Sequence, residues 1–203
     1  MKVLAFGDIH GDVSLSKALA EKAEKEKVNL VLVCGDITHF NNFFPGTFYE
    51  FVKRNLKVMF VRGNHESGAT ADFLSEFYNI TNLHNKIVNY ENIAFTGIGG
   101  ANVGPFPFSE EKIFEMLNKN LMKISKSKDI TKKVVVSHVH PSGSLIENFS
   151  SFFKGSSALE RIIKEFEPDL VLCSHVHEAA GIEENMGRTK VINVGKFGKI
   201  LEL

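Results

Sequence analysis

The sequence of 203 residues contains no tryptophan and only two cysteines, and its 24 basic and 24 acidic side chains cancel to a formal net charge of zero. This balance speaks against a protein that binds long polyanions mainly through charge. No apolar run approaches the roughly 18–20 residues that a membrane-spanning helix requires. Cys34 and Cys173 each lie in a short apolar run, which predicts packing in the core and neither a disulfide nor a reactive thiol.

Nothing at the start of the sequence resembles a secretion signal, because polar residues suited to chemistry begin at Asp8, directly after a strand-like segment. We therefore expect a cytoplasmic protein. The length and the ordinary composition favour one domain over residues 1–203, with a large buried core.

Short apolar runs alternate with segments of helical periodicity along most of the chain. Strands are expected at 3–6, 30–34, 57–61, 86–90, 93–96, 134–136 and 170–173, and helices at 13–27, 46–55, 69–78, 109–121 and 156–166. The glycine-rich residues 97–100 break one strand pattern, and 189–194 with 199–203 are interpreted as a β-hairpin. This alternation predicts an α/β fold whose later strands are mixed or antiparallel.

Two side chains that can bind metal, Asp8 and His10, follow the first predicted strand. Alternate residues of an extended backbone share a face, so these two point the same way while Ile9 points into the protein. The pair indicates a metal ion at this strand end.

Similar side chains follow four further predicted strands. They are Asp36, then Asn64 with His65, then His138, then His175 with His177. In open α/β sheets the carboxyl ends of strands face a common site, so these side chains are expected to converge. Two carboxylates, one amide and several imidazoles are too many for one tetrahedral ion, and they fit two ions that share a carboxylate.

The order of these motifs resembles that of the calcineurin-like metallophosphoesterases, of the small prokaryotic and archaeal type. The motifs are Asp8-Ile9-His10, Gly35-Asp36, Gly63-Asn64-His65-Glu66, His138 and Ser174-His175-Val176-His177. The resemblance spans nearly the whole chain and is specific for the superfamily but not for a substrate. It implies an αββα sandwich with a metal site at the carboxyl ends of the strands.

The resemblance also implies roles for single residues. The implied ligands are Asp8, His10 and His177 for one ion, Asn64, His138 and His175 for the other, and Asp36 as the bridge. The ions are expected to be divalent transition metals, with manganese as the first choice and iron, zinc, nickel or cobalt as alternatives. A hydroxide between them would attack phosphorus, and His65 would donate a hydrogen bond to phosphate or protonate the leaving oxygen.

Some positions depart from the family pattern. Ser174 replaces the usual glycine, which removes no ligand. His39 stands where the protein serine/threonine phosphatases have an aspartate, and no arginine follows it, which speaks against a protein phosphatase. For His39 a place in the pocket and an exposed loop position stay open.

Four further polar residues are expected to have structural or supporting roles. Asp12 is expected to cap the following helix, and Arg62 to face away from the site. His84 is interpreted as structural or exposed, and His140 as a residue that supports its neighbour His138 at most.

Two divalent ions bring four positive charges, and Asp8, Asp36 and a hydroxide bring three negative ones, so about one positive charge remains. That charge matches a phosphodiester monoanion, although a monoester stays open. We therefore predict hydrolysis of a small, nucleotide-like phosphodiester. The alternatives are a noncatalytic scaffold on the same fold, a nuclease and a phosphomonoesterase.

We expect no membrane partner and favour a small substrate over nucleic acid, while the oligomeric state stays open. Substrate specificity is assigned to the loops at 39–47 and 101–108, whose phenylalanines could stack on a base or pack on the core.

Overall fold

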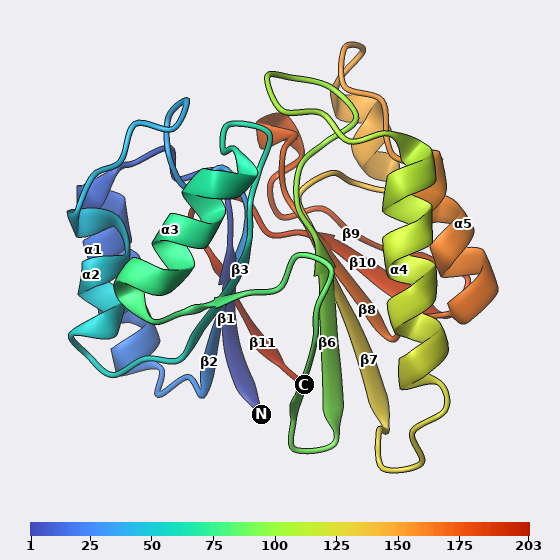
Figure 1. The fold of residues 1–203 in the computed structure, drawn as a ribbon, viewed down its shortest axis with the longest axis horizontal. Coiled ribbons are helices and arrows are strands. Elements are labelled where there is room, and N and C mark those ends of the chain that lie inside the picture. Colours follow the sequence, from blue (N-terminus) through green and yellow to red (C-terminus); the bar gives the residue numbers. More distant parts are fainter.

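The computed structural model describes residues 1–203 as two sheets packed face to face, with helices on both outer faces (Figure 1). The helices are α1 (Val13–Lys25), α2 (Gly46–Val52), α3 (Gly68–Tyr78), α4 (Glu110–Ile124) and α5 (Ser157–Phe166), with short 3-10 helices η1 (Leu145–Phe149) and η2 (His177–Ala179). None of the helices is long and apolar enough to cross a membrane. The architecture is the αββα sandwich that the sequence predicts.

The first sheet has the order β11-β1-β2-β3-β4. Its strands are β1 (Lys2–Phe6), β2 (Leu30–Cys34), β3 (Val58–Val61), β4 (Thr81–Asn82) and β11 (Lys199–Glu202), of which only β11 runs antiparallel to its neighbour. Side chains alternate along β1, so Leu4 and Phe6 pack on the helices while Val3 and Ala5 face the other sheet. Burial on both faces explains the continuous apolar runs of these strands.

The second sheet has the order β5-β6-β7-β8-β10-β9. Its strands are β5 (Ile87–Tyr90), β6 (Ile93–Ile98), β7 (Lys132–Ser137), β8 (Leu170–Cys173), β9 (Glu183–Met186) and β10 (Thr189–Asn193). The four central strands are parallel, and α4 and α5 cover the outer face. Both cysteines are buried and unpaired, as the sequence predicts, and burial raises the pKa of each thiol.

Two predictions about the later strands are wrong. Residues 189–194 and 199–203 do not form a hairpin, because β10 pairs with β8 and β9 in the second sheet while β11 pairs with β1 in the first. The strand predicted at 93–96 is also too short, since β6 continues through Gly97 and ends at Ile98. Gly97 lies where a Cβ atom would be 2.6 Å from Val61 of the facing sheet. This glycine therefore permits close packing of the sheets inside a strand.

The two sheets also meet closely where β1 and β8 end. A Cβ atom on Gly7 would lie 2.6 Å from the Ser174 Oγ atom and 2.7 Å from its Cβ atom. The Ser174 hydroxyl is buried and donates a hydrogen bond of 2.6 Å to the Cys34 carbonyl. The serine that departs from the family pattern thus fills the space that Gly7 leaves free.

This contact predicts a coupled pair of substitutions. Gly7→Ala should lower the free energy of unfolding by about 2 kcal/mol, because the added methyl group overpacks the junction. In a Ser174→Gly background the same substitution should cost much less, since its neighbour is gone. Urea unfolding of the four proteins measures the coupling. Equal costs of Gly7→Ala in both backgrounds would show that the two residues do not compete for space.

Candidate metal centre

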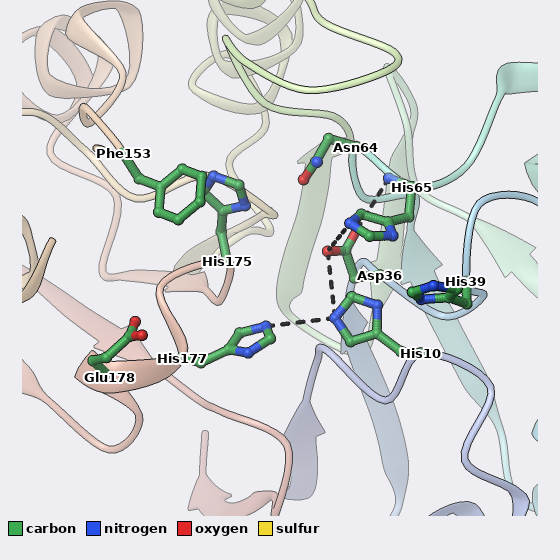
Figure 2. Close-up of a pocket in the computed structure, with 9 residues that line it drawn as sticks. All are labelled: His10, Asp36, His39, Asn64, His65, Phe153, His175, His177 and Glu178. Atoms are coloured by element: carbon green, nitrogen blue, oxygen red, sulfur yellow. Dashed lines mark hydrogen bonds and ion pairs between the residues drawn. The ribbon is translucent and has the colours of Figure 1, made fainter. Parts of the chain in front are cut away.

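Loops at the carboxyl ends of β1, β2, β3 and β8 meet and form a cleft (Figure 2). The residues that line it are His10, Asp36, His39, Asn64, His65, Phe153, His175, His177 and Glu178. Asp8 and His138 are buried in contact with these residues and are only 3% and 0% exposed. The structure therefore brings together all eight residues that the sequence analysis selects.

One group of side chains consists of Asp8, His10 and His177, whose ligand atoms all lie within 4.8 Å of one another. The Nε2 atoms of His10 and His177 are 3.4 Å apart, and His177 Nε2 is 3.8 Å from Asp8 Oδ2. Two imidazole nitrogens bound to one tetrahedral ion at ordinary lengths are about 3.4 Å apart. The spacing of the two histidines fits a shared metal ion.

A second group consists of Asp36, His138 and His175. His138 Nε2 lies 2.9 Å from Asn64 Oδ1, 3.1 Å from His175 Nδ1 and 3.4 Å from Asp36 Oδ1. On the other side of the ring, His138 Nδ1 donates a hydrogen bond of 2.8 Å to the Cys34 carbonyl. A proton held there leaves the Nε2 lone pair for the group, as in many metal-binding histidines.

The Asp36 carboxylate lies between the two groups. Its Oδ2 atom is 3.8 Å from His10 Nε2 and 3.8 Å from His65 Nε2, whereas its Oδ1 atom faces His138 and accepts a hydrogen bond of 3.1 Å from the His65 backbone N–H. A Cβ atom on Gly63 would lie 1.9 Å from Asp36 Oδ1. Only glycine at position 63 leaves room for the carboxylate.

The backbone at four of these residues is left-handed. The φ angle is +56° at Asp8, +44° at His10, +49° at Asp36 and +71° at His175. Residues other than glycine seldom adopt this region, and asparagine, aspartate and histidine do so more often than the rest. Such strain is retained where surrounding structure enforces it, commonly at functional sites. The left-handed backbone directs these side chains toward the site, an orientation that strand alternation alone does not predict.

The buried groups perturb one another electrostatically. Burial lowers the pKa of His138, but the neighbouring Asp36 and Asp8 carboxylates outweigh it and raise this pKa to about 9. Burial raises the pKa of Asp36, but the charge of His138 outweighs it and the net shift is downward. Burial lowers the pKa of His10 to about 4 and, together with His138, that of His175 to about 3. Neutral imidazoles and carboxylates bind metal, so near pH 7 His10, His175 and Asp36 are in the binding protonation state, whereas His138 would have to lose a proton to bind.

The Glu66 carboxylate joins the loops after β2 and β3. It is 0% exposed and accepts hydrogen bonds from the Thr38 N–H at 2.7 Å, the Thr38 hydroxyl at 2.8 Å and the Gly63 N–H at 2.7 Å. The sequence analysis includes Glu66 in a motif but gives it no role. The structure shows that it fixes the backbone on both sides of Asp36.

The four residues expected to have structural or supporting roles lie outside the cleft. Asp12 accepts a hydrogen bond from the Leu15 N–H and caps α1, as predicted. Arg62 stays outside the cleft and donates to the carbonyls of Glu66 and Phe106. His84 accepts a hydrogen bond from the Gly99 N–H, and His140 is fully buried and does not line the cleft.

The loops predicted to determine specificity contribute less than expected. His39 lines the cleft, but no other residue of 39–47 and none of 101–108 does so. The sequence analysis instead misses Phe153 and Glu178, which line the cleft beside His175 and His177 (Figure 2). Phe153 belongs to a phenylalanine-rich segment, the same signal that drew attention to the other loops. Glu178 directly follows the last histidine motif.

A sequence model of the calcineurin-like phosphoesterases matches residues 1–179. The chain belongs to this family. An uncharacterized protein of Methanocaldococcus jannaschii is 30% identical over 95% of this chain and 87% of its own length. The resemblance inferred from the motifs is thereby confirmed.

Solved structures of this fold include a dimetal phosphatase from Danio rerio, with a TM-score of 0.65, 12% identity, and coverage of 95% of this chain and 86% of the other. An archaeal protein described as a phosphodiesterase has a TM-score of 0.56 and 17% identity, with coverage of 96% and 84%. At these identities the likeness shows the fold alone.

The role of Glu66 predicts a loss of stability. Glu66→Ala should lower the free energy of unfolding by about 3 kcal/mol, because three buried donors lose their acceptor. The free energy of unfolding of Glu66→Gln should lie between those of the original protein and the alanine variant. One amide oxygen can still accept from Thr38, but the NH2 group would face the Gly63 N–H. Urea unfolding of metal-free protein checks both. An alanine variant as stable as the original would mean that other groups hold these loops.

The raised pKa of His138 predicts a pH dependence for the metal-free protein. A group whose pKa is higher in the folded state, here about 9 against 6.5, contributes stability that is complete below pH 6.5 and is lost as the pH rises through about 9. The loss should approach about 3 kcal/mol. Unfolding midpoints between pH 6.5 and 8 measure the slope below the range in which the two buried thiols contribute, and His138→Gln should remove it. A slope that survives this substitution would have to come from another group.

Proposed function

We propose that this protein is a dinuclear metal-dependent hydrolase of phosphate esters, with phosphodiesters as the preferred class. The observation that carries this proposal is the Asp36 carboxylate, which directs one oxygen toward each group of metal-binding side chains. Bound together, two divalent ions supply positive charge that activates water and neutralises the oxygens of the phosphoryl group.

The proposed ligands follow the two geometric groups. They are Asp8, His10 and His177 for one ion, Asn64, His138 and His175 for the other, and Asp36 for both. Asn64 adds an oxygen without further negative charge. Manganese is the first metal to test, and nickel and zinc are suitable alternatives because imidazole and carboxylate ligands accept all three.

His65 is proposed as the residue that acts on the leaving group. Its ring lines the cleft, with Nε2 3.8 Å from Asp36 Oδ2. Its ligand atom also lies within 4.8 Å of those of His10 and His39, but this third group contains no carboxylate. Burial lowers its pKa, so the ring is neutral near pH 7 and its N–H donates a hydrogen bond. From this place the neutral ring can donate a hydrogen bond to a phosphate oxygen, and the imidazolium, the minor form near pH 7, can give a proton to the departing oxygen.

The preference for diesters rests on charge. The cleft contains the carboxylate of Asp36, has that of Asp8 beside it, and is lined by no lysine or arginine. A singly charged diester needs less compensating positive charge than a doubly charged monoester, which favours the diester here.

The decisive experiment reloads metal-stripped protein with Mn²⁺, Ni²⁺ or Zn²⁺ and compares bis(p-nitrophenyl) phosphate with p-nitrophenyl phosphate. We expect turnover of both and a higher kcat/KM for the diester. A folded, metal-loaded protein that hydrolyses neither compound would support the noncatalytic scaffold, and a monoester preference would reverse the proposed substrate class.

His65→Ala should lower kcat by about 100-fold or more, the usual effect of removing an acid catalyst. Metal content after gel filtration should remain at two ions per chain, because His65 is not a proposed ligand. Loss of one ion in this variant would move His65 from the leaving group to the metal centre.

A further inference from the structure

The wall of the cleft on the His175 side consists of one aromatic and one acidic side chain. Phe153 is the only apolar residue that lines the cleft, and Glu178 is the only carboxylate there besides Asp36 (Figure 2). Neither is a member of a geometric metal-binding group. Both are therefore free to act on a bound substrate.

The segment that carries Phe153 is held by several polar contacts. Ser150 Oγ accepts hydrogen bonds from the backbone N–H groups of Phe152 and Phe153 at 3.3 and 3.2 Å. The Gly155 N–H donates to Glu147 Oε1 at 2.8 Å, and Asn102 Nδ2 donates to the carbonyls of Lys154 and Gly155 at 3.3 and 3.4 Å. Phe153 is thus supported on both sides along the chain.

The Phe153 ring packs against a proposed ligand and still offers surface to the cleft. Its centroid is 4.7 Å from that of His175, with an angle of 67° between the planes. The residue remains 37% exposed. A phenyl ring beside a phosphate site provides a contact for a flat ester group, because aromatic groups gain from stacked or edge-to-face packing.

Glu178 lies in η2, directly after His177, and its side chain is exposed at the same wall. No lysine or arginine lines the cleft to neutralise it. Lys196 lies in a separate small hollow beside Asp8 and His177, where its ammonium group is 5.3 Å from the Phe197 ring. A second phosphate on the substrate would therefore meet a negative charge on this side.

We propose that the substrate is a singly charged phosphodiester with one flat ester group and no further phosphate, an inference that rests on the proposed function. Phe153 contacts the flat group, and Glu178 disfavours a second negative charge. Both are specificity-determining residues of the same wall. The class includes aryl diesters and nucleoside diesters and leaves out nucleotides with terminal phosphates.

The role of Glu178 is tested with two probes that share one leaving group. They are thymidine 5′-(p-nitrophenyl phosphate) and the same compound with a 3′-phosphate, assayed with Mn²⁺-loaded protein. Glu178→Gln should reduce the preference for the first compound by about fivefold, the size of an exposed charge interaction. Added salt should reduce the preference of the original protein in the same direction. The exposed Glu76 gives the matched control, Glu76→Gln, which should leave the preference unchanged.

The role of Phe153 is tested by binding, without turnover. Phenyl methylphosphonate and methyl methylphosphonate carry the same single charge and differ in the flat ring. Calorimetry on Mn²⁺-loaded protein should show tighter binding of the phenyl ester, and Phe153→Leu should reduce that advantage by about fivefold. Phe152, which is 86% exposed and does not line the cleft, gives the control Phe152→Leu.

The two experiments separate this proposal from the proposed function. Absence of hydrolysis with every probe would overturn the function, while the binding comparison would still decide the role of Phe153. An active enzyme whose preferences are unchanged by Glu178→Gln and Phe153→Leu would overturn the substrate class and leave the hydrolase intact.

Discussion

The site depends on the position of one carboxylate, that of Asp36. Its two oxygens face different groups of side chains, so a shift of the carboxylate disturbs both groups at once. This position lowers the folding stability, because the backbone is left-handed at Asp36 and its side chain is almost fully buried. Neighbouring residues must therefore compensate for strain and for lost hydration.

The compensation comes from residues that never reach the cleft. Glu66 binds the backbone of Thr38 and Gly63 and so fixes the loops on both sides of Asp36. Gly63 provides the space for the Asp36 oxygen. The Cys34 carbonyl accepts from the His138 ring and from the Ser174 hydroxyl, which connects the ends of β2, β7 and β8. The centre is thus part of the contact between the two sheets.

The strands and most helices follow from local sequence, because burial on both faces produces apolar runs and burial on one face produces helical periodicity. The proposed metal ligands are also predictable, since each follows such a run. The pairing of β11 with β1 is not, because a short edge strand at 199–202 carries no signal of the sheet it joins. The assumed hairpin 189–203 was the simplest local solution, and the contact that replaces it is distant in sequence.

The same limit applies to the cleft. The proposed ligands come from motifs, whereas the position of Phe153 depends on hydrogen bonds that Glu147 and Asn102 make with its neighbours Gly155 and Lys154. Loops rich in phenylalanine occur at three places in the sequence, and only tertiary packing decides which of them supplies a wall. His39 differs from Phe153, because it lies in a loop that the sequence analysis assigns to specificity, and it does line the cleft.

On the proposed function, charge links metal binding to phosphate binding in this cleft. Burial lowers the pKa of His10 to about 4 and of His175 to about 3, so these two imidazoles carry no positive charge near pH 7. The raised pKa of His138 reflects the buried carboxylates of Asp36 and Asp8, which offset its charge, and this ring does not line the cleft. No lysine or arginine lines the cleft, and Asp36 and Glu178 contribute carboxylates. Positive charge for a phosphate must therefore come mainly from bound divalent ions. Since those ions bind unprotonated ligands, acid that displaces them also removes the attraction for substrate. Metal affinity and substrate affinity should consequently fall together as the pH is lowered.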